Sequence, residues 1–243
     1  MSTHDNEFSP QVYARIAGLL YLVVIIGGFF AEMFVRQKLM VPNNPAATAN
    51  NILTHEQLFR WGFVAELIVL LCNMPIAVIF YELFKVVNRR VTLLVVFCTL
   101  VGSAIEGAAL LYHFEPLILL KRGHDLGVST GLLQAQAYMA LRMQSTGFAV
   151  ALTFFGIYCL AIGYLIFRSR LLPRILGVLL AIEGVCYLAN SFADFLAPGI
   201  AGRVFAVLMV FGLAEVFLCL WLLVKGVDVA KWRELASISR ESF

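Results

Sequence analysis

The chain has 243 residues, of which 61% are hydrophobic and 14% are charged, and its formal net charge is +3. Soluble domains are about 45–50% apolar and about 25% charged, so this composition excludes an ordinary soluble domain and indicates an integral membrane protein. No basic run exceeds two residues, as at Arg89-Arg90, so the positive charge favours membrane topology over nucleic-acid binding.

Six apolar segments are each long enough to cross a bilayer, for which roughly 20 residues suffice. In chain order they lie at about 14–35, 60–84, 91–120, 145–167, 173–196 and 203–225. The first segment has no small-residue cleavage site, so we interpret it as a retained span and not as a signal peptide. Before the fourth segment, residues Leu132–Gln144 favour an interfacial helix. The predicted fold class is all-α, an integral membrane bundle of six transmembrane helices.

The basic residues near the span ends predict the orientation of this bundle. With both termini in the cytoplasm, the densely basic turns VNRR and FRSRLLPR lie on the inner side, as the positive-inside rule requires. The predicted organisation is therefore a cytoplasmic N-terminal tail at 1–13, a six-span transmembrane domain at 14–225, and a cytoplasmic C-terminal tail at 226–243. The predicted location is the bacterial inner membrane.

Four acidic residues fall inside the predicted spans. Glu106, Glu183 and Glu215 lie near the middle of their segments, and Glu66 lies in the outer half of the second segment. A charged side chain at the bilayer centre costs about 2.5–3.5 kcal/mol on insertion scales. We therefore expect these carboxyls to face the bundle interior, where they are protonated, paired, wetted or bound to a cation.

Other polar residues share helix faces with these acids. In the stretch AIEGVCYLANSFADFL, Glu183 is followed by Tyr187 and Asn190 at i+4 and i+7. Glu106 and His113 are likewise seven residues apart, and an arginine opens the second and the sixth spans. These residues predict an outward-facing acidic cavity, whose site comprises Glu66, Glu106, Glu183, Glu215, Asn190, Tyr187, Arg60, Arg203 and His113.

Two further acids have a basic residue one helical turn away. Glu32 precedes Arg36 by four residues, and Glu82 precedes Lys85 by three. This spacing is typical of ion pairs along one helix, and we interpret both pairs as structural.

Known catalytic and metal-binding patterns are absent from the sequence. It has no HExxH, no paired histidines and no CxxC among its five cysteines, so we predict no metal and no cofactor. It also has no GxSxG and no serine with a histidine at helical spacing, so no catalytic residue is predicted and a non-enzymatic role is favoured.

Three functions fit this pattern. The first is a cavity that binds or conducts a proton, a cation or a small polar or cationic molecule, as in transport. The second is a structural or accessory membrane subunit without a ligand, in which the acids only form hydrogen bonds between helices. The third is a membrane enzyme acting on lipid. The expected partners are the lipid bilayer and a small polar or cationic ligand, with no nucleic acid, and the oligomeric state stays open.

Several strings give the chain a resemblance to a known family. They are YARIAGLLYL (13–22), FFAEMFVR (29–36), the loop PNNPAATANNIL followed by FRWGFVAEL (59–67), and FRSRLLPRILGVLL (167–180) followed by NSFADFLAP (190–198). On these strings the chain resembles the bacterial multi-pass membrane family called domain of unknown function 4386, over nearly its whole length. The resemblance implies a helical inner-membrane protein and implies no activity.

Overall fold

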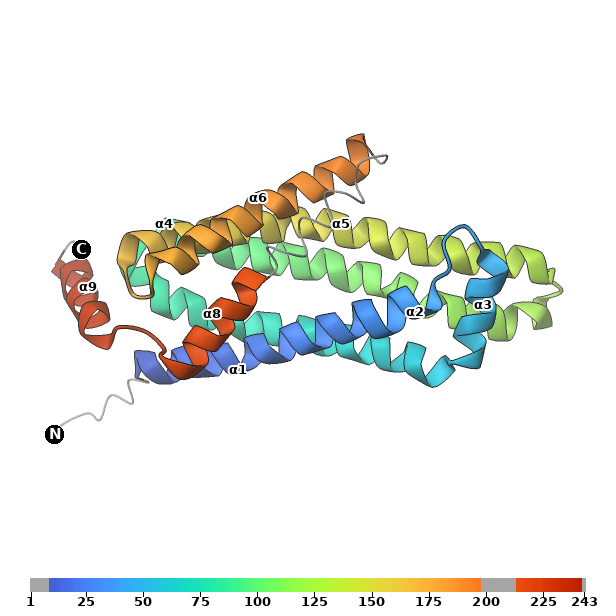
Figure 1. Cartoon of the computed structure of the whole chain (residues 1–243), viewed down its shortest axis with the longest axis horizontal. Coiled ribbons are helices and arrows are strands. Elements are labelled where there is room, and N and C mark those ends of the chain that lie inside the picture. The colour runs from blue at the N-terminus through green and yellow to red at the C-terminus, as the bar shows by residue number, and fades with distance from the viewer. Residues whose placement is uncertain (1–8, 198–212, 242–243) are drawn as a thin grey trace. The chain divides into compact units, whose positions relative to one another are not determined.

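The computed structural model describes residues 9–197 and 213–241, and within them it contains helices and no strands (Figure 1). The elements are α1 (Pro10–Phe29), η1 (Phe30–Arg36), α2 (Gln37–Leu39), α3 (Pro45–Thr54), α4 (Glu56–Arg122), η2 (Gly123–Leu126), α5 (Thr130–Ser169), α6 (Arg174–Leu196), α8 (Leu213–Val224) and α9 (Val229–Glu241). The predicted all-α class is confirmed for this part of the chain. Helix α9 lies inside the predicted C-terminal tail.

Four helical stretches of the described residues are long and apolar enough to cross a membrane. They are Pro10–Leu39, Glu56–Arg122, Thr130–Ser169 and Arg174–Leu196. Large apolar side chains on these helices lie on the outside, and Leu71, Phe97 and Leu111 are 64%, 61% and 70% exposed. Exposure of such apolar surfaces to water is unfavourable, whereas contact with lipid acyl chains is favourable. The long apolar helices indicate a multi-pass membrane protein.

Helix α4 contains both the second and the third predicted spans. Its backbone leaves the helical conformation at Asn88, where φ is −159° and ψ is 100°. The Asn88 side-chain oxygen accepts the N–H groups of Arg90 and Val91, at 3.1 and 3.2 Å, and so caps the following helical stretch. The break falls in the predicted turn VNRR. The sixth predicted span is described only from Leu213 onward, and the six-span count and cytoplasmic termini stay predictions.

Helix α5 joins two segments that the sequence analysis separated. The expected interfacial helix at Leu132–Gln144 is continuous with the fourth predicted span, in one helix of 40 residues. No proline interrupts this stretch. The hydroxyl groups of Ser145 and Thr146 bond back to the carbonyls of Leu141 and Arg142, so polar residues at the expected boundary are satisfied within the helix.

The chain divides into two compact units, and α1, α4 and α5 each contribute residues to both. The first unit comprises Met1–Leu22, Met74–Leu100 and Thr153–Phe243, and the second comprises Val23–Asn73 and Val101–Leu152. In the second unit, η1, α3, α4 and α5 share an apolar core that includes Val35, Ile52, Phe59 and Leu133.

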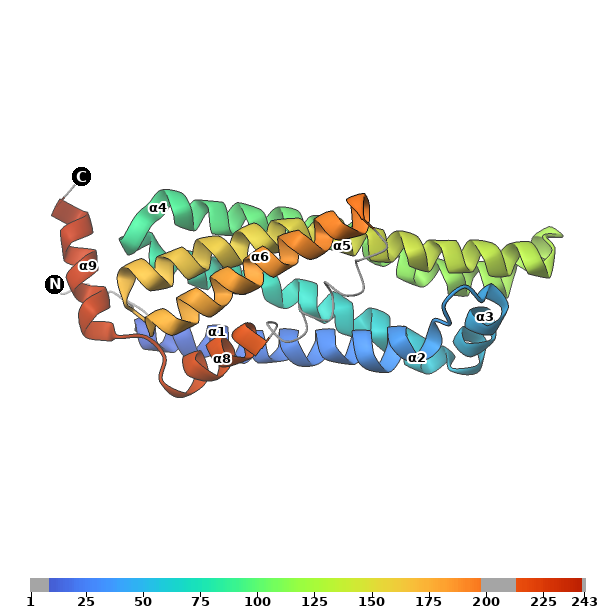
Figure 2. The ribbon, with the colours of Figure 1, turned by 45° about the horizontal axis from the view of Figure 1, so that its top comes forward.

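In the first unit, α5 and α6 lie side by side (Figure 2) because glycines remove the side chains between them. A Cβ atom placed on Gly163 would lie 2.6 Å from the Gly177 carbonyl oxygen, and one on Gly177 would lie equally close to that of Gly163. Further along α6, a Cβ on Gly184 would lie 2.6 Å from the Gly156 carbonyl oxygen. This close approach of two backbones is typical of helix packing in membranes.

Candidate functional site

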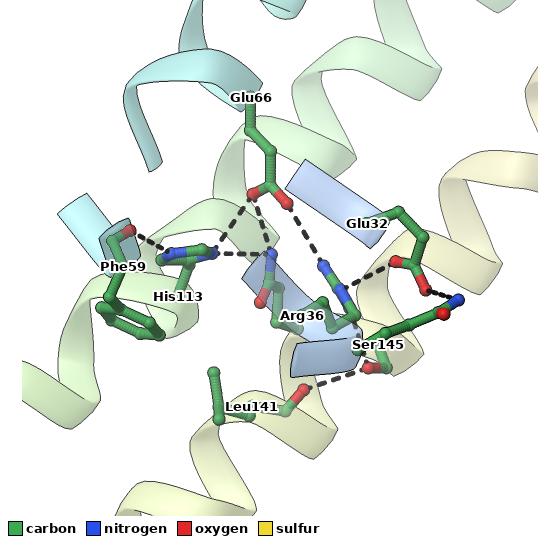
Figure 3. A network of polar contacts seen from close by, with 9 residues as sticks. Glu32, Arg36, Phe59, Glu66, His113, Leu141 and Ser145 are labelled. Atoms are coloured by element: carbon green, nitrogen blue, oxygen red, sulfur yellow. Dashed lines mark hydrogen bonds and ion pairs between the residues drawn. The ribbon is translucent and has the colours of Figure 1, made fainter. Parts of the chain in front are cut away.

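Arg36 is the centre of a polar network in the second unit (Figure 3). It ends the π-helical stretch η1, a rare conformation that is frequent at functional sites. Its Nε contacts Glu32 Oε2 at 3.1 Å, its Nη2 contacts Glu66 Oε1 at 3.3 Å, and its Nη1 donates to Ser145 Oγ at 3.0 Å. The predicted pair of Glu32 with Arg36 is confirmed, and the guanidinium also joins η1 to α4 and α5.

The second oxygen of Glu66 faces two more side chains. Gln144 Nε2 donates to Glu66 Oε2 at 2.9 Å, and His113 Nδ1 lies 3.4 Å from the same oxygen. On the other side of the ring, His113 Nε2 lies 3.1 Å from the Phe59 carbonyl oxygen. A carbonyl oxygen only accepts, so Nε2 is the ring nitrogen that donates, and in a neutral ring Nδ1 is an acceptor.

We define the Arg36 network as Glu32, Arg36, Glu66, His113, Gln144 and Ser145. With His113 neutral, the network has a formal charge of −1, from the two glutamates and Arg36. The network is thus nearly neutral, and its hydrogen bonds are mutually satisfied, as a polar group in a membrane-embedded bundle requires.

Glu106 belongs to the same unit and is half-buried. Glu66 and Arg36 are the charged groups that act on it electrostatically. Within the described part of the chain, its carboxyl group forms no hydrogen bond or ion pair. Glu106 is therefore the open carboxyl beside an otherwise satisfied network.

A second group of acids lies in the first unit, where α5, α6 and α8 contribute one residue each. The Cys159 sulfur and carboxyl oxygens of Glu183 and Glu215 all lie within 4.8 Å of one another. The Glu183 side chain is fully buried, at 0% exposure. We call these three residues the Glu183 cluster.

Tyrosine hydroxyls surround this cluster. Tyr187 donates to Glu183 Oε1 at 3.2 Å, and Tyr21 donates to Glu215 Oε1 at 3.0 Å. The Tyr21 and Tyr158 hydroxyls lie 3.2 Å apart, and because Tyr21 uses its one hydrogen on Glu215, Tyr158 is the donor of that pair. The result is a directed chain from Tyr158 through Tyr21 to Glu215.

Among the residues that the structure describes, two buried side-chain oxygens of α6 have no hydrogen-bond partner. They are Glu183 Oε2 and Asn190 Oδ1. A buried polar atom left unpaired costs about 1–3 kcal/mol, and more for a charged group. Protonation of the carboxyl group would lower this cost for Glu183, because the neutral form is less costly to bury than the charged form.

The Glu183 cluster also has no cationic neighbour within residues 9–197 and 213–241. The ion pairs in this part of the chain do not include Glu183 or Glu215. Two carboxyl groups this close in a low-dielectric interior do not both ionise unless a cation lies between them. The arrangement therefore suits either a shared proton or a small cation held by carboxylate oxygens.

The structure describes eight of the nine predicted site residues and places six of them in or beside these two groups of polar contacts, while Asn190 is buried on α6 and its side-chain oxygen has no hydrogen-bond partner among the described residues. Glu66, Glu106 and His113 lie in the second unit, and Glu183, Tyr187, Asn190 and Glu215 lie in the first. Arg60 instead pairs with Glu56, at 2.8 Å, and Arg203 lies outside the described residues. The four expected carboxyls thus form two pairs, one in each unit, and a single cavity shared by all four stays a prediction.

Sequence reasoning missed several partners of these acids. They are Arg36 as a link between helices, Gln144, Ser145, Tyr21, Tyr158 and Cys159. Only Arg36 carried a local signal, its spacing from Glu32, and that spacing says nothing about Glu66. The other predicted structural pair, Glu82 with Lys85, is confirmed at 2.6 Å.

Comparison with known proteins gives a family and one distant relative. Residues 16–226 match the family described as domain of unknown function 4386, which confirms the family that the sequence resembles. An uncharacterized protein of Archaeoglobus fulgidus is 24% identical over 166 residues, which cover 68% of this chain and 84% of that protein. No solved structure matches the chain.

Proposed function

The chain belongs to the family of domain of unknown function 4386, and from the geometry we propose that it is a membrane protein binding a proton or a small cation at the Glu183 cluster. One observation carries this proposal. The Glu183 and Glu215 carboxyls and the Cys159 sulfur lie within 4.8 Å of one another, and one oxygen of the fully buried Glu183 has no hydrogen-bond partner among the described residues. Transport is the role that such a site would serve.

The chemistry of the donors favours a proton or a hard cation over a zinc site. Two carboxyl groups supply oxygen ligands, and tyrosine hydroxyls lie next to both of them. Hard cations prefer oxygen ligands, whereas structural zinc sites use four ligands that are mostly cysteine and histidine. The cluster offers one thiol and no histidine. The oxygen-rich set also fits a carboxyl pair that shares one proton.

The proposal includes a location and an orientation. We place the protein in the bacterial inner membrane as a multi-pass protein, with both termini in the cytoplasm and the acids in the middle and outer half of the spans. The long apolar helices support a membrane location, and the basic turns between the predicted spans support the orientation.

Infrared spectroscopy of the purified protein tests the site directly. At neutral pH we expect the carbonyl band of a protonated carboxyl group, and either Glu183→Gln or Glu215→Gln should remove it, since each variant breaks the pair. If a cation occupies the pair, the band should be absent and should emerge when sodium and divalent ions are removed.

Glu82→Gln is the matched control, because Glu82 forms an exposed ion pair with Lys85. This variant should leave the spectrum of the buried pair unchanged. A spectrum with no protonated carboxyl and no response to cation removal would contradict the proposal. So would a band that persists in both cluster variants.

The alternative of a structural subunit has its own support in the Arg36 network. That network is nearly neutral and internally bonded, which is what hydrogen bonding between helices without a ligand requires. The unpartnered oxygen of Glu183 distinguishes the Glu183 cluster from it.

A further inference from the structure

A basic cavity lies at the end of the first unit where α5 turns into α6 and where α8 leads to α9. Its volume is about 590 Å³, and Arg170, Arg174 and Lys225 line it together with Trp221 and Asp228. The charges of the lining sum to +2, from three cations and one carboxylate. The cavity therefore suits an anion.

The three cations have no anionic partner within the described part of the chain. No ion pair there includes Arg170, Arg174 or Lys225. The Arg174 guanidinium lies over the Phe167 ring, 5.0 Å from its centroid, which orients it without neutralising it. The Asp228 carboxylate accepts the Lys231 N–H at 3.0 Å and so caps α9.

The backbone around the cavity is held in a fixed conformation. Arg170 has a φ of +57°, a left-handed conformation that is uncommon for a residue with a side chain. The Asp228 N–H donates to the Leu171 carbonyl at 3.0 Å, which ties the two turns together. Gln11 of α1 bonds to the Lys225 carbonyl and to the Val227 N–H, at 2.8 and 3.1 Å. These hydrogen bonds hold in place the two turns that carry the cations.

An apolar groove continues from this cavity along α6 and α8. Its volume is about 420 Å³, and it shares Trp221 and Lys225 with the basic cavity. Its other lining residues are all apolar and include Leu179, Phe217 and Leu220. A free phosphate ion would leave this groove unused, whereas a phospholipid has an acyl chain of the chemistry that fits it.

We propose that this end of the first unit binds an anionic phospholipid, with the phosphate headgroup in the basic cavity and an acyl chain in the adjoining groove. In the predicted orientation the cavity lies at the cytoplasmic surface, where anionic lipids and basic pockets meet. Trp221 lies between headgroup and chain, the level that tryptophan favours in membrane proteins. This site is independent of the Glu183 cluster.

Native mass spectrometry of the full chain in neutral detergent tests the proposal with phosphatidylglycerol and phosphatidylcholine as probes. We expect retained phosphatidylglycerol and at least about tenfold weaker binding of phosphatidylcholine, since each basic residue near a lipid surface contributes about 1 kcal/mol. The double variant Arg170→Gln/Lys225→Gln should lose about thirtyfold in phosphatidylglycerol affinity, because it removes two of these residues.

Arg89→Gln/Arg90→Gln is the matched control, because it removes the same charge from another exposed basic turn of the first unit. It should bind phosphatidylglycerol as the unaltered protein does. An equal loss of affinity in both variants would mean that general surface charge causes the binding, and it would overturn the proposal. Equal binding of the two lipids would overturn it as well. Displacement of the lipid by inorganic phosphate at similar concentration would assign the cavity to free phosphate and overturn it too. Thermal unfolding of each variant separates loss of binding from loss of folding.

Discussion

Gly163→Leu should destabilise the protein by about 3 kcal/mol, because α5 and α6 approach with no room for a side chain. A Cβ on Gly163 would lie 2.6 Å from the Gly177 carbonyl oxygen and 3.1 Å from the Ala181 backbone nitrogen. These are backbone atoms, so a rotamer change cannot relieve the overlap and the two helices must separate. Denaturant or thermal unfolding in detergent micelles measures the loss.

Gly28→Leu is the control for this effect. Gly28 is a helical glycine of α1. Outside the local helix backbone, a Cβ added to it would meet no atom of the described residues within 4 Å, so the first atom of a leucine side chain fits there. We expect an unchanged or slightly raised stability, since leucine favours the helix more than glycine does. If the two variants lost equal stability, the close contact between α5 and α6 would be wrong. Gly177→Leu should reproduce the loss from the opposite helix.

Local sequence signals predicted the helical segments of the described chain well. Apolar run lengths placed the long helices, and the turn VNRR marked the break at Asn88, whose side chain supplies a cap. The same signals failed at the start of α5. There the polar residues of Leu132–Gln144 indicated a separate interfacial helix, but a helix of 40 residues continues through them because nothing in the backbone stops it.

The site was predictable only where its geometry is local. The spacing of Glu183 and Tyr187 places them on one face, and the structure joins them by a hydrogen bond of 3.2 Å. By contrast, the bond from Tyr21 to Glu215 joins residues 194 positions apart, and helix periodicity carries no information on which helices meet. Arg60 was also expected near the buried acids of other helices, but it forms an ion pair with Glu56, one turn earlier on the same helix.

Arg36→Gln should cost about 3–5 kcal/mol, because it leaves Glu66 and Glu32 without their shared cation. The Arg36 and Glu66 side chains are 22% and 16% exposed, so water screens them only weakly. Glutamine keeps hydrogen-bonding capacity but not the charge. The double variant Arg36→Gln/Glu66→Gln should be more stable than Arg36→Gln alone, since it removes the stranded carboxylate together with the cation.

Unfolding measurements on both single variants and the double variant form a cycle that isolates the coupling of Arg36 with Glu66. Arg60→Gln is the comparison, because its partner Glu56 keeps Lys121 at 2.9 Å and the Arg60 side chain is 42% exposed, so the free energy of unfolding should change little. Additive losses in the cycle would mean that the two charges do not stabilise one another. A strong coupling would instead establish the Arg36 network as the element that fixes η1 against α4.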